Sequence, residues 1–183
     1  MKEQRWINIL MTMVLVLLVF SKVRDTSEVP MAIDFNGNGG RVSFGAKTSL
    51  DNLSTISICY WINPDSLPDF GAGGAYDFAV AKLSDGVNGW FTSPGGSITD
   101  ATDNAIYYTD VFSTRYGRWV SPNNSMATGS WQFVCVTFDR SSSANNPIIY
   151  IGGASVAVTE LSAPSGSVNN DSTNVVEIGG SVL

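Results

Sequence analysis

The stretch W-Q-F-V-C-V-T-F-D, residues Trp131–Asp139, decides the fold class of this chain. It consists almost entirely of aromatic and β-branched residues, which suit the packed, pleated surface of a β-sheet. Because side chains alternate between the two faces of a strand, Val134, Val136 and Phe138 share one face and the odd-numbered residues share the other. Neither face is strongly polar, so the stretch predicts a central strand.

The residues after this strand predict an antiparallel continuation. Asp139–Asn146 is a polar turn, and Pro147–Ile151 is a second strand that returns beside the first. Gly152-Gly153 then forms a tight turn into Ala154–Glu160.

An earlier stretch, S-T-I-S-I-C-Y-W-I-N-P at Ser54–Pro64, contains a second long strand. Between Leu53 and Ile62 the apolar residues alternate cleanly with the others, and we expect their face to be core. Further strands are predicted at Ala32–Phe35, Arg41–Phe44, Tyr76–Leu83, Gly89–Thr92, Asn104–Thr109, Arg118–Val120 and Asn174–Ile178. No helical period follows residue 20.

The order and spacing of these strands resemble the laminin-G-like and pentraxin-like families of concanavalin-type jelly rolls. In those families a Trp-started strand ends in Thr-aromatic-Asp and is followed by a hydrophobic-Tyr-hydrophobic-x-Gly hairpin. The matching residues are Trp131, Thr137, Phe138, Asp139, Ile149, Tyr150, Ile151 and Gly153. The resemblance implies an all-β fold, a jelly-roll β-sandwich of two antiparallel sheets.

The first 30 residues predict a segment outside this domain. Lys2 and Arg5 precede a 15-residue apolar run that ends at Phe20, and as a helix this run spans about 22 Å, less than the roughly 30 Å of a bilayer core. We expect residues 1–21 to be a signal peptide or a membrane anchor, 22–30 a linker and 31–183 the sandwich. A third alternative is that translation begins at Met31.

The chain ends soon after its last predicted strand. Relatives usually continue with a loop and a closing strand, so we expect that strand to be missing here. Either the sequence is a fragment or a neighbouring chain in an oligomer completes the sheet, since an unpaired central strand would leave an exposed edge.

Cys59 and Cys135 are the two cysteines of the chain, and each lies in the middle of a signature strand. Pentraxins carry a disulfide that joins the corresponding strands, so the resemblance implies a Cys59–Cys135 bond. The alternative is two unrelated buried thiols. A disulfide would agree with an oxidising compartment outside the cytosol.

Composition argues against several function classes. The chain has no histidine, the commonest general base and zinc ligand, and the predicted domain has only two glutamates, Glu160 and Glu177, in separate strands. Glycosidases need paired carboxylates, so we expect no enzyme. The net charge of −6 argues against a nucleic-acid partner, and a membrane contact is expected only through the N-terminal segment.

Calcium is the cofactor that the resemblance suggests. Asp103 and Asn104 precede a predicted strand, where pentraxins place a calcium-binding Asp-Asn pair. Their oxygens are ligands that a hard cation accepts. The alternative is an Asx turn that begins the strand.

Aromatic residues predict the ligand surface. Trp90, Trp119 and Tyr116 lie near glycine-rich loops, and we expect them to be exposed and to stack on sugar rings. Trp61 and Trp131 are expected to pack beside the cysteine pair, with sugar stacking as the alternative. The predicted function is a non-catalytic, secreted or cell-surface binding or adhesion module for glycans. The alternative is an assembly module of a virion or surface filament that contacts a surface protein.

Overall fold

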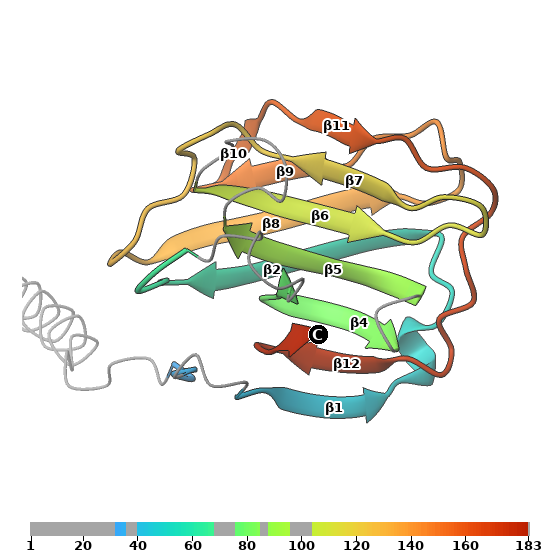
Figure 1. Ribbon diagram of the computed structural model, residues 1–183, viewed down its shortest axis with the longest axis horizontal. Helices are drawn as coiled ribbons and strands as arrows, with labels where there is room; N and C mark the ends of the chain where they lie inside the picture. Colours follow the sequence, from blue (N-terminus) through green and yellow to red (C-terminus); the bar gives the residue numbers. More distant parts are fainter. Residues whose placement is uncertain (1–31, 36–39, 68–75, 85–87, 96–103, 183) are drawn as a thin grey trace, which may run out of the picture. The chain divides into compact units, whose positions relative to one another are not determined.

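The computed structural model describes residues 32–35, 40–67, 76–84, 88–95 and 104–182 (Figure 1). The predicted signal peptide or anchor at 1–21 and the linker at 22–30 lie outside the described residues. In the part of the chain that the structure describes, no helix is long and apolar enough to cross a membrane.

Two antiparallel sheets form the sandwich. The seven-stranded sheet has the order β1 (Val42–Ala46), β12 (Val175–Ile178), β4 (Val80–Ser84), β5 (Asn88–Gly95), β6 (Ala105–Asp110), β7 (Gly117–Val120) and β11 (Thr159–Ser162). The four-stranded sheet has the order β10 (Ala154–Val156), β9 (Ile148–Ile151), β8 (Gln132–Asp139) and β2 (Thr55–Ile62). β3 (Tyr76–Asp77) pairs with β13 (Ser181–Val182), and a short 3₁₀ helix η1 (Thr48–Leu50) precedes β2.

The predicted jelly-roll sandwich of two antiparallel sheets is therefore confirmed. One strand prediction is wrong in an informative way. Ala154–Glu160 was expected to be a single strand, but β10 pairs with β9 in one sheet and β11 pairs with β7 in the other. The chain crosses from sheet to sheet between Val156 and Thr159, a change of layer that residue type alone does not reveal. Ala32–Phe35, also expected as a strand, has no regular structure.

The main core lies between the two sheets. Ile56 and Ile58 of β2 and Val134 and Val136 of β8 are buried in it, as their alternation predicted. Phe138 connects the layers, because its ring centroid lies 5.7 Å from that of Tyr108 on β6 and 5.1 Å from that of Trp119 on β7. β8 therefore faces β6 and β7.

Candidate functional site

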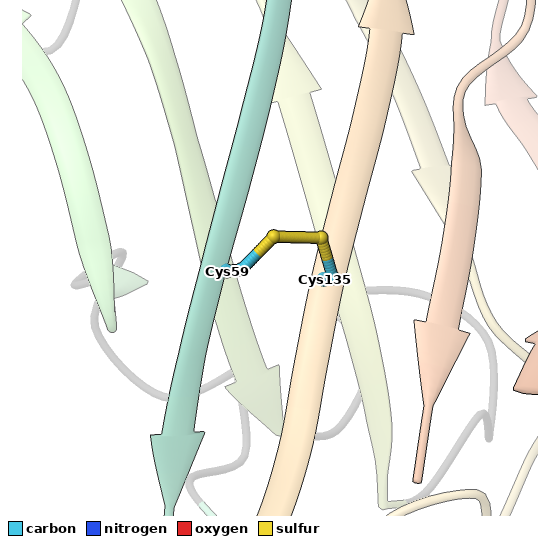
Figure 2. The surroundings of a disulfide bond; sticks show 2 residues. All are labelled: Cys59 and Cys135. Carbon is cyan, nitrogen blue, oxygen red and sulfur yellow. A yellow bond between two sulfur atoms is a disulfide. The ribbon is translucent and has the colours of Figure 1, made fainter. Parts of the chain in front are cut away.

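A disulfide bond joins the two long strands that the sequence singled out. β2 and β8 pair antiparallel in a register that sets Cys59 directly opposite Cys135, with Cα atoms 4.0 Å apart (Figure 2). The predicted bond is confirmed. Both cysteines lie on the face of the four-stranded sheet that points away from the core, since the buried Ile58 and Val136 have the opposite parity.

Two residues farther along each strand, the same outer face carries large aromatic side chains. Trp61 of β2 pairs with Phe133 of β8, and their ring centroids are 5.6 Å apart. Trp131 precedes β8 with the same parity as Phe133. Trp61 is 65% exposed and Trp131 is 53% exposed. We call these three residues the aromatic face.

The surroundings of the aromatic face are neutral along β2, whereas β8 ends in the exposed Asp139, which lies opposite Thr55 on the same side. β2 carries no charged residue, and its exposed Thr55 and Ser57 present hydroxyl groups on the same side. Ile148 of β9 is also exposed there, opposite Thr137 of β8. The face thus combines apolar rings with hydroxyl groups and lacks a charge along β2.

The expectation that Trp61 and Trp131 pack away from solvent is wrong. Their strands do place them on the side of the cysteine pair, as predicted. However, the second sheet covers only the other side of β2 and β8, so rings with this parity remain in contact with water.

The expectation that Trp90 and Trp119 are exposed is also wrong. Trp90 is 5% exposed and Trp119 is fully buried, and both belong to the main core. The indole Nε1 of Trp119 donates a hydrogen bond to Asn146 Oδ1 at 2.7 Å. A Cβ added at Gly117 would collide with the ring of Trp119. Gly117 therefore leaves the space that the Trp119 ring fills. A glycine beside Trp119 does not indicate an exposed loop here.

Tyr116 is the one aromatic ligand candidate from the sequence that lies at the surface. It is 44% exposed, and the guanidinium carbon of Arg118 lies 5.2 Å from its ring centroid. This geometry is that of a cation–π contact. Tyr116 is accessible, but neither Trp90 nor Trp119 can reach a ligand with it.

Of the proposed calcium ligands, Asp103 lies outside the described residues. Asn104 has a left-handed backbone with φ of 59°, and its side-chain amide donates to Asn124 Oδ1 at 3.4 Å. The Asn104 carbonyl accepts a hydrogen bond from the amide of Met126 at 2.8 Å. Within the described residues, no group of three or more Asp, Glu, Cys or His is arranged to hold a metal ion. Calcium binding at this loop stays a prediction.

Sequence reasoning missed a cluster of five charged residues near the end of β4 and β6, Asp51, Lys82, Asp110, Arg140 and Asp171, which we call the ion cluster. Lys82 Nζ lies 2.6 Å from Asp51 Oδ1 and 3.0 Å from Asp171 Oδ1. Arg140 Nη1 lies 3.6 Å from Asp171 Oδ2. The side chains of all members except Asp51 are fully buried. A signal existed, because Lys82 is a charged residue inside an otherwise apolar strand.

Burial and ion pairing shift the acid–base properties of this cluster. Burial raises the pKa of the Asp110 carboxyl above its ordinary value, although Arg140 opposes this shift. Burial lowers the pKa of Arg140, but Asp110, Tyr108 and Asp171 together outweigh burial and leave the pKa of Arg140 raised. Tyr108 donates a hydrogen bond to Asp110 Oδ2 at 2.9 Å, and burial together with Asp110 raises its pKa. The charged groups of the ion cluster pair with one another, so the cluster is suited to holding together the chain segments that supply them.

A surface hollow lies beside the ion cluster. Its volume is about 460 Å³, within the usual range for ligand sites. Its lining is mostly small and hydroxylated, and consists of Phe112, Arg140, Ser141, Ser142, Ser143, Gly166, Ser167 and Val168. Among its described lining residues no aromatic ring is exposed, since Phe112 is buried.

Comparison with known proteins agrees with this architecture. No curated protein matches the chain. Residues 36–182 match the laminin-G-like family described as the concanavalin A-like lectin/glucanases superfamily. This match covers most of the chain and all the strands of the sandwich, so the protein belongs to the laminin-G-like family of the concanavalin A-like lectin/glucanase superfamily.

Proposed function

We propose that this protein is a non-catalytic, carbohydrate-binding module that works outside the cytosol, and that its ligand stacks on the aromatic face. The observation that carries the proposal is the exposure of Trp61 and Trp131 beside Phe133 on one side of the four-stranded sheet. Large exposed apolar patches on a folded domain mark interaction sites, because exposing them to water is unfavourable.

The chemistry of the face suits a sugar. The apolar side of a pyranose ring packs on a tryptophan, and hydroxyl groups nearby satisfy the polar rim of the sugar. Ser57 and Thr55 supply such hydroxyl groups on β2. The absence of charge along β2 favours a neutral glycan over an acidic one. The disulfide supports an extracellular or cell-surface location, since such bonds persist in oxidising compartments.

The proposal is tested with single alanine variants on a glycan array, followed by calorimetry with the best glycan. Trp61→Ala and Trp131→Ala should each weaken binding about tenfold or more, as expected for an aromatic anchor. Their melting temperatures should stay close to that of the wild type, because the removed rings are exposed. Phe44→Ala is the matched control, since Phe44 is an exposed aromatic residue on β1.

Tyr116→Ala distinguishes the rival site that the sequence favoured. Loss of binding in Tyr116→Ala, with Trp61→Ala and Trp131→Ala unaffected, would move the ligand to the loop after β6. A folded wild type that binds no glycan at all would overturn the proposal.

A second function is favoured by the same apolar exposure. The aromatic face and the exposed Ile148 would also suit a protein contact in an assembly on a virion or surface filament. A protein contact of this kind would leave the glycan array blank, while Trp61→Ala would still disrupt assembly in a sedimentation experiment.

A further inference from the structure

Lys82 is a buried amine in contact with two carboxyl groups. It lies in the middle of β4, where pairing with β5 on one side and β12 on the other fixes its backbone. Its side chain is fully buried, and Nζ lies 2.6 Å from Asp51 Oδ1 and 3.0 Å from Asp171 Oδ1. The carbonyl of Leu50 accepts a further hydrogen bond from Nζ at 2.9 Å. A nitrogen nucleophile is therefore held against a carboxyl group inside the protein.

Asp171 is fixed in place as firmly as Lys82. Its side chain is fully buried in the segment between β11 and β12. Asn52 binds it through two reciprocal hydrogen bonds, since Asn52 N donates to Asp171 Oδ1 at 2.8 Å and Asp171 N donates to Asn52 Oδ1 at 3.2 Å. Lys82 and Asp171 thus meet with little freedom of movement. Holding two reactive groups in this way greatly raises their effective concentration.

An ion pair alone leaves this region incompletely satisfied. The ion cluster contains three aspartates and two basic residues, so its charges do not balance. Within the described residues, no hydrogen bond reaches Asp171 Oδ2, and Arg140 Nη1 remains 3.6 Å away. A buried carboxylate oxygen without a hydrogen bond is costly. Forming an amide between Lys82 and Asp171 removes this oxygen and two buried charges together.

We propose that Lys82 and Asp171 condense to an intramolecular amide, which cross-links β4 to the segment before β12. A bond forms between Lys82 Nζ and Asp171 Cγ, and the bond between Cγ and Oδ2 breaks. Of the three protons on the ammonium group, one stays on the amide nitrogen and two leave with Oδ2 as water. The step requires no oxidant, reductant or further reactant.

Asp51 and Asn52 assist this condensation. Asp51 Oδ1 takes a proton from Nζ, which frees the nitrogen lone pair for attack on Cγ, and then passes the proton to the departing Oδ2. The backbone N–H of Asn52 donates to Asp171 Oδ1 and stabilises the negative charge that develops there during the attack. Because the Lys82 and Asp171 side chains are fully buried, water has little access to hydrolyse the product.

The cross-link secures a different part of the sandwich from the disulfide. Cys59–Cys135 joins β2 to β8 in the four-stranded sheet. Lys82 and Asp171 are 89 residues apart, and their bond joins β4 of the seven-stranded sheet to the segment that leads into its neighbour β12. A reducing agent breaks the disulfide and leaves an amide intact. One covalent loop therefore stays closed in any redox environment.

Tandem mass spectrometry of a proteolytic digest tests the proposal on the reduced full-length chain. The wild type should release one branched peptide that contains Lys82 and Asp171 and is lighter by one water molecule than its two linear parts. Lys82→Met should give the linear peptides alone. Because the digest locates the bond directly, processing at either end of the chain does not affect the result. Only linear peptides from the folded wild type would overturn the proposal, and a bond from Lys82 to Asp51 would overturn the choice of Asp171.

Asp51→Asn separates proton transfer from folding. Asparagine keeps a side-chain oxygen beside Lys82 but does not accept its proton, so the cross-linked fraction at a fixed time after synthesis should fall about tenfold or more. Near-ultraviolet circular dichroism should show that the variant is folded. Asp65→Asn makes the same change at an exposed aspartate outside the ion cluster and should cross-link as the wild type does. Full cross-linking of Asp51→Asn would overturn the catalytic role of Asp51.

Discussion

Arg140 forms an ion pair with Asp110 inside the protein through two separate hydrogen bonds. Nε lies 2.7 Å from Oδ2 and Nη2 lies 3.0 Å from Oδ1, and both side chains are fully buried. Arg140 Nη1 also donates to the carbonyl of Leu53 at 3.1 Å, so one side chain links β6, the start of β2 and the end of β8.

Replacing Arg140 should be strongly destabilising. Arg140→Met leaves the carboxylate of Asp110 buried without its partner, which should cost about 3–5 kcal/mol in the free energy of unfolding. Urea denaturation followed by tryptophan fluorescence measures this loss. Arg115→Met is the control, because Arg115 is exposed and its loss should cost less than about 0.5 kcal/mol. Equal losses in the two variants would refute a structural role for the pair.

The free energy of unfolding should depend on pH through the titration of Asp110. Its pKa in the folded protein is raised above the ordinary value of 3.8, so the folded state binds a proton at higher pH than the unfolded chain does. The contribution of Asp110 to stability is therefore fully present below pH 3.8 and is lost as the pH rises through the folded pKa. The stability of wild type minus that of Asp110→Asn should fall with rising pH across this window in denaturation at several pH values. A difference that rises would show that the pKa is lowered by Arg140 instead.

Breaking the disulfide should destabilise the sandwich without changing its fold. Cys59 and Cys135 are separated by 76 residues, and closing a loop of that length contributes about 4 kcal/mol in the chain-entropy view. Unfolding with and without reductant measures the loss, and mass spectrometry should find the oxidised chain two protons lighter. Cys59→Ser/Cys135→Ser should match the reduced wild type. No effect of reductant would mean that the bond is absent in solution.

Alanine variants of Trp119 and Tyr116 should lose different amounts of stability, because one ring is in the core and the other at the surface. Trp119→Ala removes a fully buried ring and should cost about 3–5 kcal/mol, whereas Tyr116→Ala should cost less than about 1 kcal/mol. Thermal unfolding of both variants measures this contrast. Similar losses would contradict the burial of Trp119.

Calcium should bind weakly, if the Asp103-Asn104 loop is a site as its sequence suggests. Titration calorimetry should show heat for the wild type and less heat for Asp103→Ala, because the carboxylate is a preferred calcium ligand. Identical traces without heat would leave Asn104 as a turn residue.

The sequence predicted the sandwich well because alternation and strand order are local properties. The pairing of Cys59 with Cys135 followed from the same alternation once the family resemblance named the partner strands. The tryptophans show where this reasoning ends. A period of two identifies the residues that share a face, but which face the second sheet covers depends on contacts far along the chain.

Glycine misled the prediction of the binding site. The positions of Trp90 and Trp119 beside Gly89 and Gly117 suggested exposed rings, but both glycines belong to strands in which the rings are packed. A Cβ at Gly89 would collide with the carbonyl oxygen of Lys82, and its φ is 106°. Glycine marks close packing in one place and a turn in another, and the residue type does not distinguish them. The ion cluster escaped prediction because its members come from five separate segments.

The bond between Cys59 and Cys135 has a consequence for how β2 can behave as an edge. A slip of one residue against β8 would turn Ile56 and Ile58 to water and Ser57 into the core, and the covalent link forbids such a slip. It also prevents β2 from leaving its sheet to replace the same strand in another molecule. The oxidised domain is thereby protected from domain swapping through β2, a common hazard for proteins with an unpaired edge.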